Sequence, residues 1–287
     1  MIDNYVRRLF TTFAGDQEIR LVIGIAYLIA SVFFILGLKF MSSPRTARRG
    51  MFMAEAGMGL AIITTLLDQE IVSLEWILIG LVIGSVAGYI MAILTPMTAM
   101  PQRTALSHAF GALAAALVGV TKYYTGHVKG DDHGVMVAIG LEVLLGAMTF
   151  TGSMIAFGKL QGTLPGAPIQ YKGQNAVNFV IIAVLLGSFG YLVYNPGATE
   201  LFYVLALVSL IFGVSLVLPI GAADMPVVMS LLNAYAGLAG CATGFALNNN
   251  VLIIAGALDG ASGVILSIIM TKAMNRSMTN VLFGGFG

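Results

Sequence analysis

The feature that most constrains this chain is a series of long apolar segments. Nine of them, each about 20 residues long, are separated by short polar connections. In lipid an isolated segment can satisfy its backbone only by hydrogen-bonding within itself, so each segment is expected to be a helix. The sequence therefore predicts an all-α integral membrane protein, a polytopic bundle of about nine transmembrane helices. The segments run approximately over residues 20–41, 50–67, 74–95, 102–121, 135–158, 175–194, 199–219, 225–246 and 250–273.

Composition agrees with this fold class and excludes several functions. The 287 residues are 58% hydrophobic and 9% charged, whereas roughly a quarter of the residues in a soluble domain are charged. A net charge of +1 offers no basic field for nucleic acid. The single cysteine, Cys241, excludes an internal disulfide and a cysteine metal site, and we predict no metal site.

The distribution of Lys and Arg predicts the orientation, because cytoplasmic connections carry more of them. Nine of the 14 basic residues fall on one side of the predicted helices, which we assign to the cytoplasm: Lys39, Arg45, Arg48, Arg49, Arg103, Lys159, Lys172, Lys272 and Arg276. The C-terminus is then cytoplasmic, and an odd number of spans places the N-terminus outside. Residues 1–19 form an external segment, either a short interfacial helix or a disordered tail.

Two of the apolar segments resemble each other. Aligning "MPQRTALSHAFGALAAALVG" (100–119) with "MPVVMSLLNAYAGLAGCATG" (225–244) gives identity at seven positions and places His108 on Asn233. A parallel repeat of this kind places sites between equivalent helices, although two Ala/Gly-rich spans can also align by composition alone. Pro101 and Pro226 predict helix starts, because proline is favoured in the first turn.

His108 and Asn233 are the candidate site residues of these two helices. Each lies seven residues after its proline, roughly 10 Å into the helix. Histidine has an unperturbed pKa of about 6.5, so it can gain and release a proton near neutral pH, and an amide beside it can orient the ring or hold a water. A proton path is one interpretation. The alternative is a histidine that bonds across a helix interface for packing alone.

Other polar residues in the segments extend this hypothesis. Glu142 would lie near the outer end of its helix, either as the external mouth of a proton relay or as an interfacial residue. Asp259 lies about nine residues into the last segment and must be neutral, paired or hydrated. Asp224, two residues before Pro226, is predicted to cap the following helix. We found no Walker loop, dinucleotide fingerprint or nucleophile elbow, so no cofactor is expected to bind this chain by itself.

Five motifs together resemble the membrane domain of the beta subunit of proton-translocating NAD(P) transhydrogenase. They are "GAADMPVV", "LLNAYAG", "MTFTGSMIAFGKL", "GASGVILS" and the closing "KAMNRSMTNVLFGGFG". The resemblance covers the chain from about Arg20 to Gly287. It implies that residues 20–276 form the proton-translocating domain, and that residues 277–287 begin a linker to an NADP(H)-binding domain that the given sequence does not contain.

The resemblance also implies roles for individual residues. His108 matches the proton-carrying histidine of the family, and Asn233 matches the asparagine on the facing helix. Asp224 matches an aspartate in communication with the NADP(H) domain, Ser262 and Gly263 match positions that affect coupling, and Arg276 matches the basic residue at the cytoplasmic exit. Asp259 departs from the family pattern, where an apolar residue is expected, and is a second proton site or a salt-bridge partner.

The resemblance further implies an assembly in the bacterial inner membrane. The family transfers hydride between NAD(H) on an alpha subunit and NADP(H) on the beta subunit, coupled to proton movement, and forms a homodimer of alpha–beta units. This chain alone is then not expected to transfer hydride. Two other functions stay open from the residues themselves: a secondary transporter with a substrate pocket between the repeats, and a structural membrane anchor, which would tolerate loss of His108 and Asn233.

Overall fold

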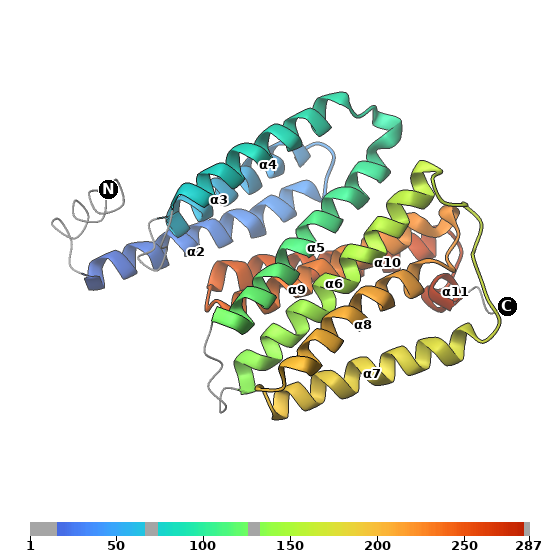
Figure 1. The fold of residues 1–287 in the computed structure, drawn as a ribbon. Helices are drawn as coiled ribbons and strands as arrows, with labels where there is room; N and C mark the ends of the chain where they lie inside the picture. Colours follow the sequence, from blue (N-terminus) through green and yellow to red (C-terminus); the bar gives the residue numbers. More distant parts are fainter. Residues whose placement is uncertain (1–15, 67–73, 126–132, 284–287) are drawn as a thin grey trace. The chain divides into compact units, whose positions relative to one another are not determined.

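A computed structural model describes residues 16–66, 74–125 and 133–283 (Figure 1), and every regular element in these ranges is helical. Nine of the helices are long. Their bounds are α2 Asp16–Met41, α3 Ala47–Leu66, α4 Leu74–Leu94, α5 Met100–Thr125, α6 His133–Gln161, α7 Gln174–Tyr194, α8 Thr199–Val217, α9 Met225–Ala246 and α10 Asn250–Ala273. Two 3₁₀ turns, η1 Met97–Ala99 and η2 Ala222–Asp224, and the short helix α11 Met278–Phe283 complete the described part. The predicted all-helical fold is confirmed.

Eight of these helices are long and apolar enough to cross a membrane, counting the described residues only. The exception is α3, which carries Arg48 and Arg49 in its first turn and Glu55 near its middle. The predicted count of about nine spans is therefore supported for eight. The predicted external segment 1–19 lies mostly outside the described residues, but its last four residues already belong to α2.

The chain divides into two compact units, Met1–Thr95 and Pro96–Gly287. In the first unit α2 and α3 pack against each other through small residues. A Cβ added at Gly37 would lie 3.1 Å from the carbonyl oxygen of Gly50, and one at Gly57 would lie 3.1 Å from that of Ala30. The Tyr27 hydroxyl also lies 2.9 Å from Thr65 Oγ1. Glycines at these positions let the two backbones approach closely, as is common between membrane helices.

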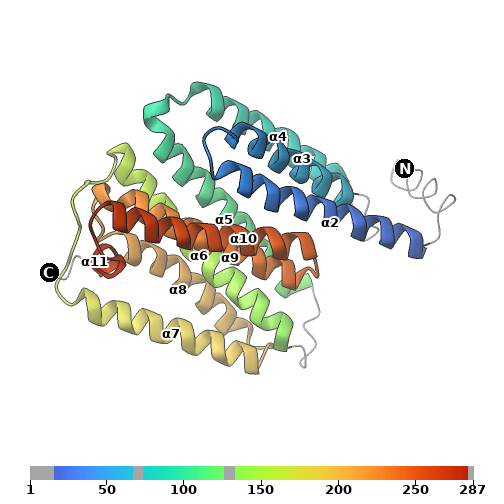
Figure 2. The same cartoon turned by 180° about the vertical axis from the view of Figure 1, so that it is seen from behind.

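In the second unit α6 is the central helix. It packs against α5, α7, α8 and α9, and α10 packs on α9 (Figures 1 and 2). Fifteen residues of α6 are buried, more than in any other described helix. Two apolar clusters surround it, one around Phe202 and Leu205 and the other around Val217 and Met225. About half of the residues of α6 are therefore enclosed by the neighbouring helices.

A tight hairpin joins α9 to α10. Asn248 has a φ of 53°, its N–H donates to the Phe245 carbonyl, and the Asn249 N–H donates to the Gly244 carbonyl. This is the Schellman arrangement, in which a residue in the left-handed region closes a helix. The Asn249 side chain then caps α10 by accepting from the Leu252 N–H at 3.1 Å. The run of asparagines in the sequence thus ends one helix and starts the next.

The predicted repeat has a structural counterpart at the helix starts. Pro96 and Gly221 have nearly the same extended backbone, with φ and ψ of −66° and 155° and of −71° and 154°. Each precedes a three-residue 3₁₀ turn, and each turn leads into a helix that begins Met-Pro, at Met100 and Met225. The helix starts predicted from Pro101 and Pro226 are confirmed.

Candidate functional site

Contacts with α6 show that α5 and α9 run in the same direction. Near the start of α6, Glu142 lies against Gly119 of α5 and Thr243 of α9. Further along α6, Gly146 lies against Ala112 and Ala116 of α5, and Gly152 lies against Leu232 of α9. Because both neighbours are antiparallel to α6, they are parallel to each other. The repeat alignment pairs Gly119 with Gly244, so residues paired by the alignment lie at about the same level.

His108 and Asn233 are one such pair, and the structure brings Asp259 to them. Asn233 Nδ2 donates a hydrogen bond to Asp259 Oδ1 of α10 at 3.1 Å. Asp259 also lies close enough to act electrostatically on the His108 imidazole of α5. His108 and Asn233 are half-buried, and Asp259 is exposed on the surface of the described chain. One amide and one carboxyl are therefore hydrogen-bonded within the membrane-spanning helices, with an imidazole near enough to feel the carboxyl's charge, and we call these three residues the His108 cluster.

The two residues predicted to affect coupling lie one turn further along α10. The Ser262 hydroxyl donates to the Asp259 carbonyl at 2.9 Å, within its own helix. Gly263 is buried against α9: an added Cβ would lie 2.7 Å from the backbone N of Ala234, the residue that follows Asn233. The Ser230 hydroxyl donates to the Gly263 carbonyl at 3.0 Å. Gly263 thus sets the spacing between α9 and α10 beside the Asn233–Asp259 bond.

Glu142 does not join this cluster. It is fully buried, and Thr243 Oγ1 donates a hydrogen bond to its Oε1 at 2.5 Å. Its Oε2 is buried and has no hydrogen-bond partner in the described part of the chain. Thr243 follows Asn233 by ten residues, about 15 Å along α9. Glu142 is enclosed by α5, α6 and α9. Its role, as the external mouth of a proton relay or as an interfacial residue, stays a prediction.

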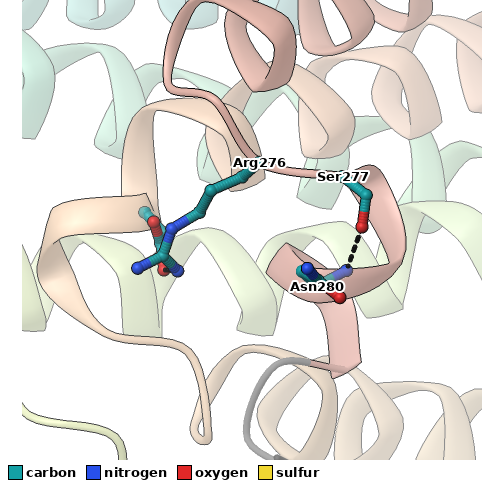
Figure 3. Close-up of polar contacts among 4 residues, drawn as sticks. Arg276, Ser277 and Asn280 are labelled. Carbon is teal, nitrogen blue, oxygen red and sulfur yellow. Dashed lines mark hydrogen bonds and ion pairs between the residues drawn. The ribbon is translucent and has the colours of Figure 1, made fainter.

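A third polar contact lies at the opposite end of α9. Arg276 donates from its guanidinium to Asp224 Oδ2 at 2.7 Å, with the Asp224 side chain 13% exposed and the Arg276 side chain 49% exposed. Asn275, with a φ of 54°, ends α10 in a second Schellman arrangement, and Figure 3 shows Arg276 extending from this connection. Two residues predicted separately to serve coupling are therefore ion-paired.

The predicted capping role of Asp224 is wrong. Asp224 occupies the N-cap position of α9, but its side chain caps no backbone N–H. The physical reason is its backbone, with φ −93° and ψ −2°, which continues the preceding 3₁₀ turn instead of adopting the extended conformation that a capping side chain needs. The carboxylate is thereby left for Arg276.

The segment that follows Arg276 packs against the same end of the bundle. Ser277 Oγ accepts a hydrogen bond from the Asn280 N–H at 3.0 Å and so caps α11 (Figure 3). Val281 is 3% exposed and belongs to the apolar cluster that includes Ile220 and Met225. The first residues of the predicted linker 277–287 therefore form a docked helix, and the last four lie outside the described residues.

The structure thus groups the predicted residues into three places: His108, Asn233, Asp259, Ser262 and Gly263 around the α9–α10 contact, Asp224 and Arg276 at one end of α9, and Glu142 toward the other. Sequence reasoning missed Thr243, because a threonine in a small-residue stretch is usually a packing residue. It also missed Lys159, which was counted only as a positive charge of a connection. A charged residue inside the last turn of a buried helix was the available signal.

Comparison with known proteins identifies relatives over almost the whole chain. The family model for the NAD(P) transhydrogenase beta subunit matches residues 23–287. NAD(P) transhydrogenase subunit beta of Rhodospirillum rubrum is 43% identical over 268 residues, which is 91% of this chain and 58% of the relative. The subunit beta sequence of a designated strain of that species gives the same figures. The chain therefore spans 58% of the length of the relatives it matches.

Proposed function

Since this chain belongs to the NAD(P) transhydrogenase beta subunit family, we propose that it is the proton-translocating membrane domain of such an enzyme. In this proposal protons cross the membrane past His108 and Asn233, and their movement is coupled to hydride transfer between NAD(H) and NADP(H). NAD(H) binds an alpha subunit, and NADP(H) binds a domain in the part of the relatives that this chain does not cover. The chain itself binds neither cofactor.

The observation that carries the proposal is the His108 cluster. An imidazole is the side chain best suited to gain and release protons near neutral pH. Here it is within electrostatic range of a carboxyl that is hydrogen-bonded to Asn233, and the three groups come from three different helices. Ionisable residues inside membrane helices are costly and are usually retained for function. Asp259 serves in this proposal as a second proton acceptor next to His108.

Asp224 and Arg276 link the pathway to the nucleotide domain. Their ion pair lies about 13 Å from Asn233 along α9, at the end of the bundle where α11 docks. Ser262 and Gly263 connect the two places, because they lie on α10, which ends at Ala273, three residues before Arg276. Binding of NADP(H) and protonation of His108 must each favour one of two arrangements, and by linkage each then affects the other. Glu142 is the candidate proton group on the external side.

The proposal includes the topology and the assembly. The N-terminus lies outside and the C-terminus lies in the cytoplasm, with nine spans if α3 also crosses the membrane. The membrane is the bacterial inner membrane. The partners are the alpha subunit and a second alpha–beta unit, as the family implies.

The test uses this chain fused to an NADP(H)-binding domain and assembled with the alpha subunit in liposomes. Hydride transfer from NADPH to an NAD analogue is followed together with the internal pH. We expect the parent to move protons during turnover and His108→Ala to lose proton movement. An intact proton signal in His108→Ala would remove the central role of His108. A secondary transporter would move substrate without the nucleotide domain, and a structural anchor would be indifferent to both His108 and Asn233.

A further inference from the structure

Lys159 is a buried cation that the proposed function does not use. It lies in the last turn of α6 and is 3% exposed. Its Nζ donates to the carbonyl oxygens of Leu218 at 2.5 Å and Ile220 at 2.7 Å, and it lies 3.5 Å from that of Ala167. An ammonium group has three donors, so these carbonyls account for all of them. A buried charge bonded in this way is costly to disturb, because removing it leaves buried carbonyls without partners.

The carbonyls that Lys159 binds belong to the end of α8 and the loop after it. Leu218 is the residue that caps α8 at its C-terminus, where the helix dipole favours a cation. The same loop is bonded to the segment after α6, since the Ala222 N–H donates to the Gly166 carbonyl at 2.8 Å. The Ile169 N–H donates to the Leu218 carbonyl at 3.3 Å. Lys159 therefore lies at the centre of a small hydrogen-bonded block formed by two connections.

This block holds both points where the segment after α10 is attached. Ile220, whose carbonyl binds Lys159, belongs to the apolar cluster that buries Val281 of α11. Asp224, four residues further on, binds Arg276. The loop thus contributes Asp224 to the ion pair and Ile220 to the apolar cluster, and Lys159 connects that loop to the end of α6. At the other end of α6 lies Glu142, against α5 and α9.

We propose that Lys159 is a positioning residue that fixes the 218–224 loop, so that Asp224 and Ile220 stay in place to receive Arg276 and Val281. The coupling part of this inference rests on the proposed function. The cation acts through Asp224 and Arg276 and touches no reacting group. Removing it frees the loop from α6, and movement of the membrane helices then no longer reaches the segment that leads to the nucleotide domain.

The first test measures amide hydrogen exchange of this chain in lipid nanodiscs. Lys159→Met keeps the length of the side chain and removes its donors. We expect exchange to be faster by about tenfold in residues 218–224 and 278–283, with no change in α2 and α3, which belong to the other unit. Lys172→Met is the matched control, because Lys172 lies in a neighbouring connection and is exposed. Lys159→Arg should restore most of the protection.

Unchanged exchange in residues 218–224 of Lys159→Met would overturn the proposal. If Lys159→Met loses protection in α2 and α3 as well, the variant has failed to fold. Lys159→Gln, which keeps two N–H donors, is then measured in its place, with faster exchange again expected in residues 218–224 and 278–283.

The second test uses the assembled enzyme in liposomes and measures protons moved per hydride transferred. A positioning role predicts that Lys159→Met lowers this ratio severalfold while hydride transfer continues. A general loss of structure would lower proton movement and hydride transfer in proportion, leave the ratio unchanged and count against the proposal. The two tests separate the inference from the proposed function. If His108→Ala still moves protons but the loop of Lys159→Met exchanges faster, the function falls and the structural role of Lys159 stands.

Discussion

At the scale of single residues, the bond between Asn233 and Asp259 is the feature most open to measurement. It joins α9 to α10, because Asn233 donates a hydrogen bond to the Asp259 carboxyl. We predict that Asn233→Ala lowers the free energy of unfolding by about 1 kcal/mol. A double-mutant cycle with Asp259→Ala, measured by thermal unfolding in one detergent, should give a coupling energy of similar size. Additive effects of the two substitutions would show that the bond contributes nothing to stability.

The buried pair of Glu142 and Thr243 is expected to matter more for stability. Thr243→Val keeps the shape of the side chain but leaves a fully buried carboxyl without its bond to Thr243. We predict a loss of about 2 kcal/mol, because a buried polar group without a partner retains its full desolvation cost. Thr121→Val is the control, since Thr121 is exposed and its hydroxyl donates to the Leu117 carbonyl of its own helix. Equal melting temperatures for the two variants would contradict the prediction.

At the scale of helices, the close contact between α9 and α10 determines whether the His108 cluster can form. An added Cβ at Gly263 would lie 2.7 Å from a backbone nitrogen and 2.9 Å from the Ser230 carbonyl oxygen, and backbone atoms cannot rotate away. We predict that Gly263→Ala separates the helices, costs about 2 kcal/mol of unfolding free energy and reduces proton coupling. Gly111→Ala on α5, where an added Cβ meets nothing within 4 Å, should be neutral or slightly stabilising. Equal stability of the two alanine variants would contradict this packing argument.

The helices were predictable because hydrophobicity, length and a few turn residues determine them. The structure ends α7 at Tyr194 and α9 at Ala246, as the apolar segments indicated. Side-chain partners were less predictable. The repeat placed His108 level with Asn233, but nothing in the sequence said that α10 would bring Asp259 to them. Asp224 was expected to cap a helix because aspartate before Met-Pro usually does, and its 3₁₀ backbone, which the sequence pattern does not reveal, directed it to Arg276 instead.

At the scale of the whole molecule, we expect the ion pair between Asp224 and Arg276 to couple proton movement to the nucleotide domain more than to stabilise the fold. The Arg276 side chain is half-exposed, so the pair contributes little to stability. We predict that Asp224→Asn changes the melting temperature little but lowers the number of protons moved per hydride. The exchanged pair Asp224→Arg with Arg276→Asp should recover part of that ratio, measured in the liposome assay. An unchanged number of protons moved per hydride in Asp224→Asn would argue that the pair has no coupling role.

The sequence also predicts the orientation of the molecule in the membrane, and an experiment can test it directly. In the predicted topology of nine spans, basic residues gather on the side that includes the α2–α3 connection, and the α7–α8 connection is expected on the other side. In a Cys241→Ser background, a cysteine replacing Ser42 should be protected from a membrane-impermeant maleimide in intact cells, and one replacing Gly197 should react. Both positions are exposed and lie between helices, so a difference in their reaction with maleimide reports the side of the membrane and not burial in the protein. Reaction at Ser42→Cys with protection at Gly197→Cys would reverse the orientation and place Asp224, Arg276 and Lys159 outside, which a link to a cytoplasmic nucleotide domain does not permit.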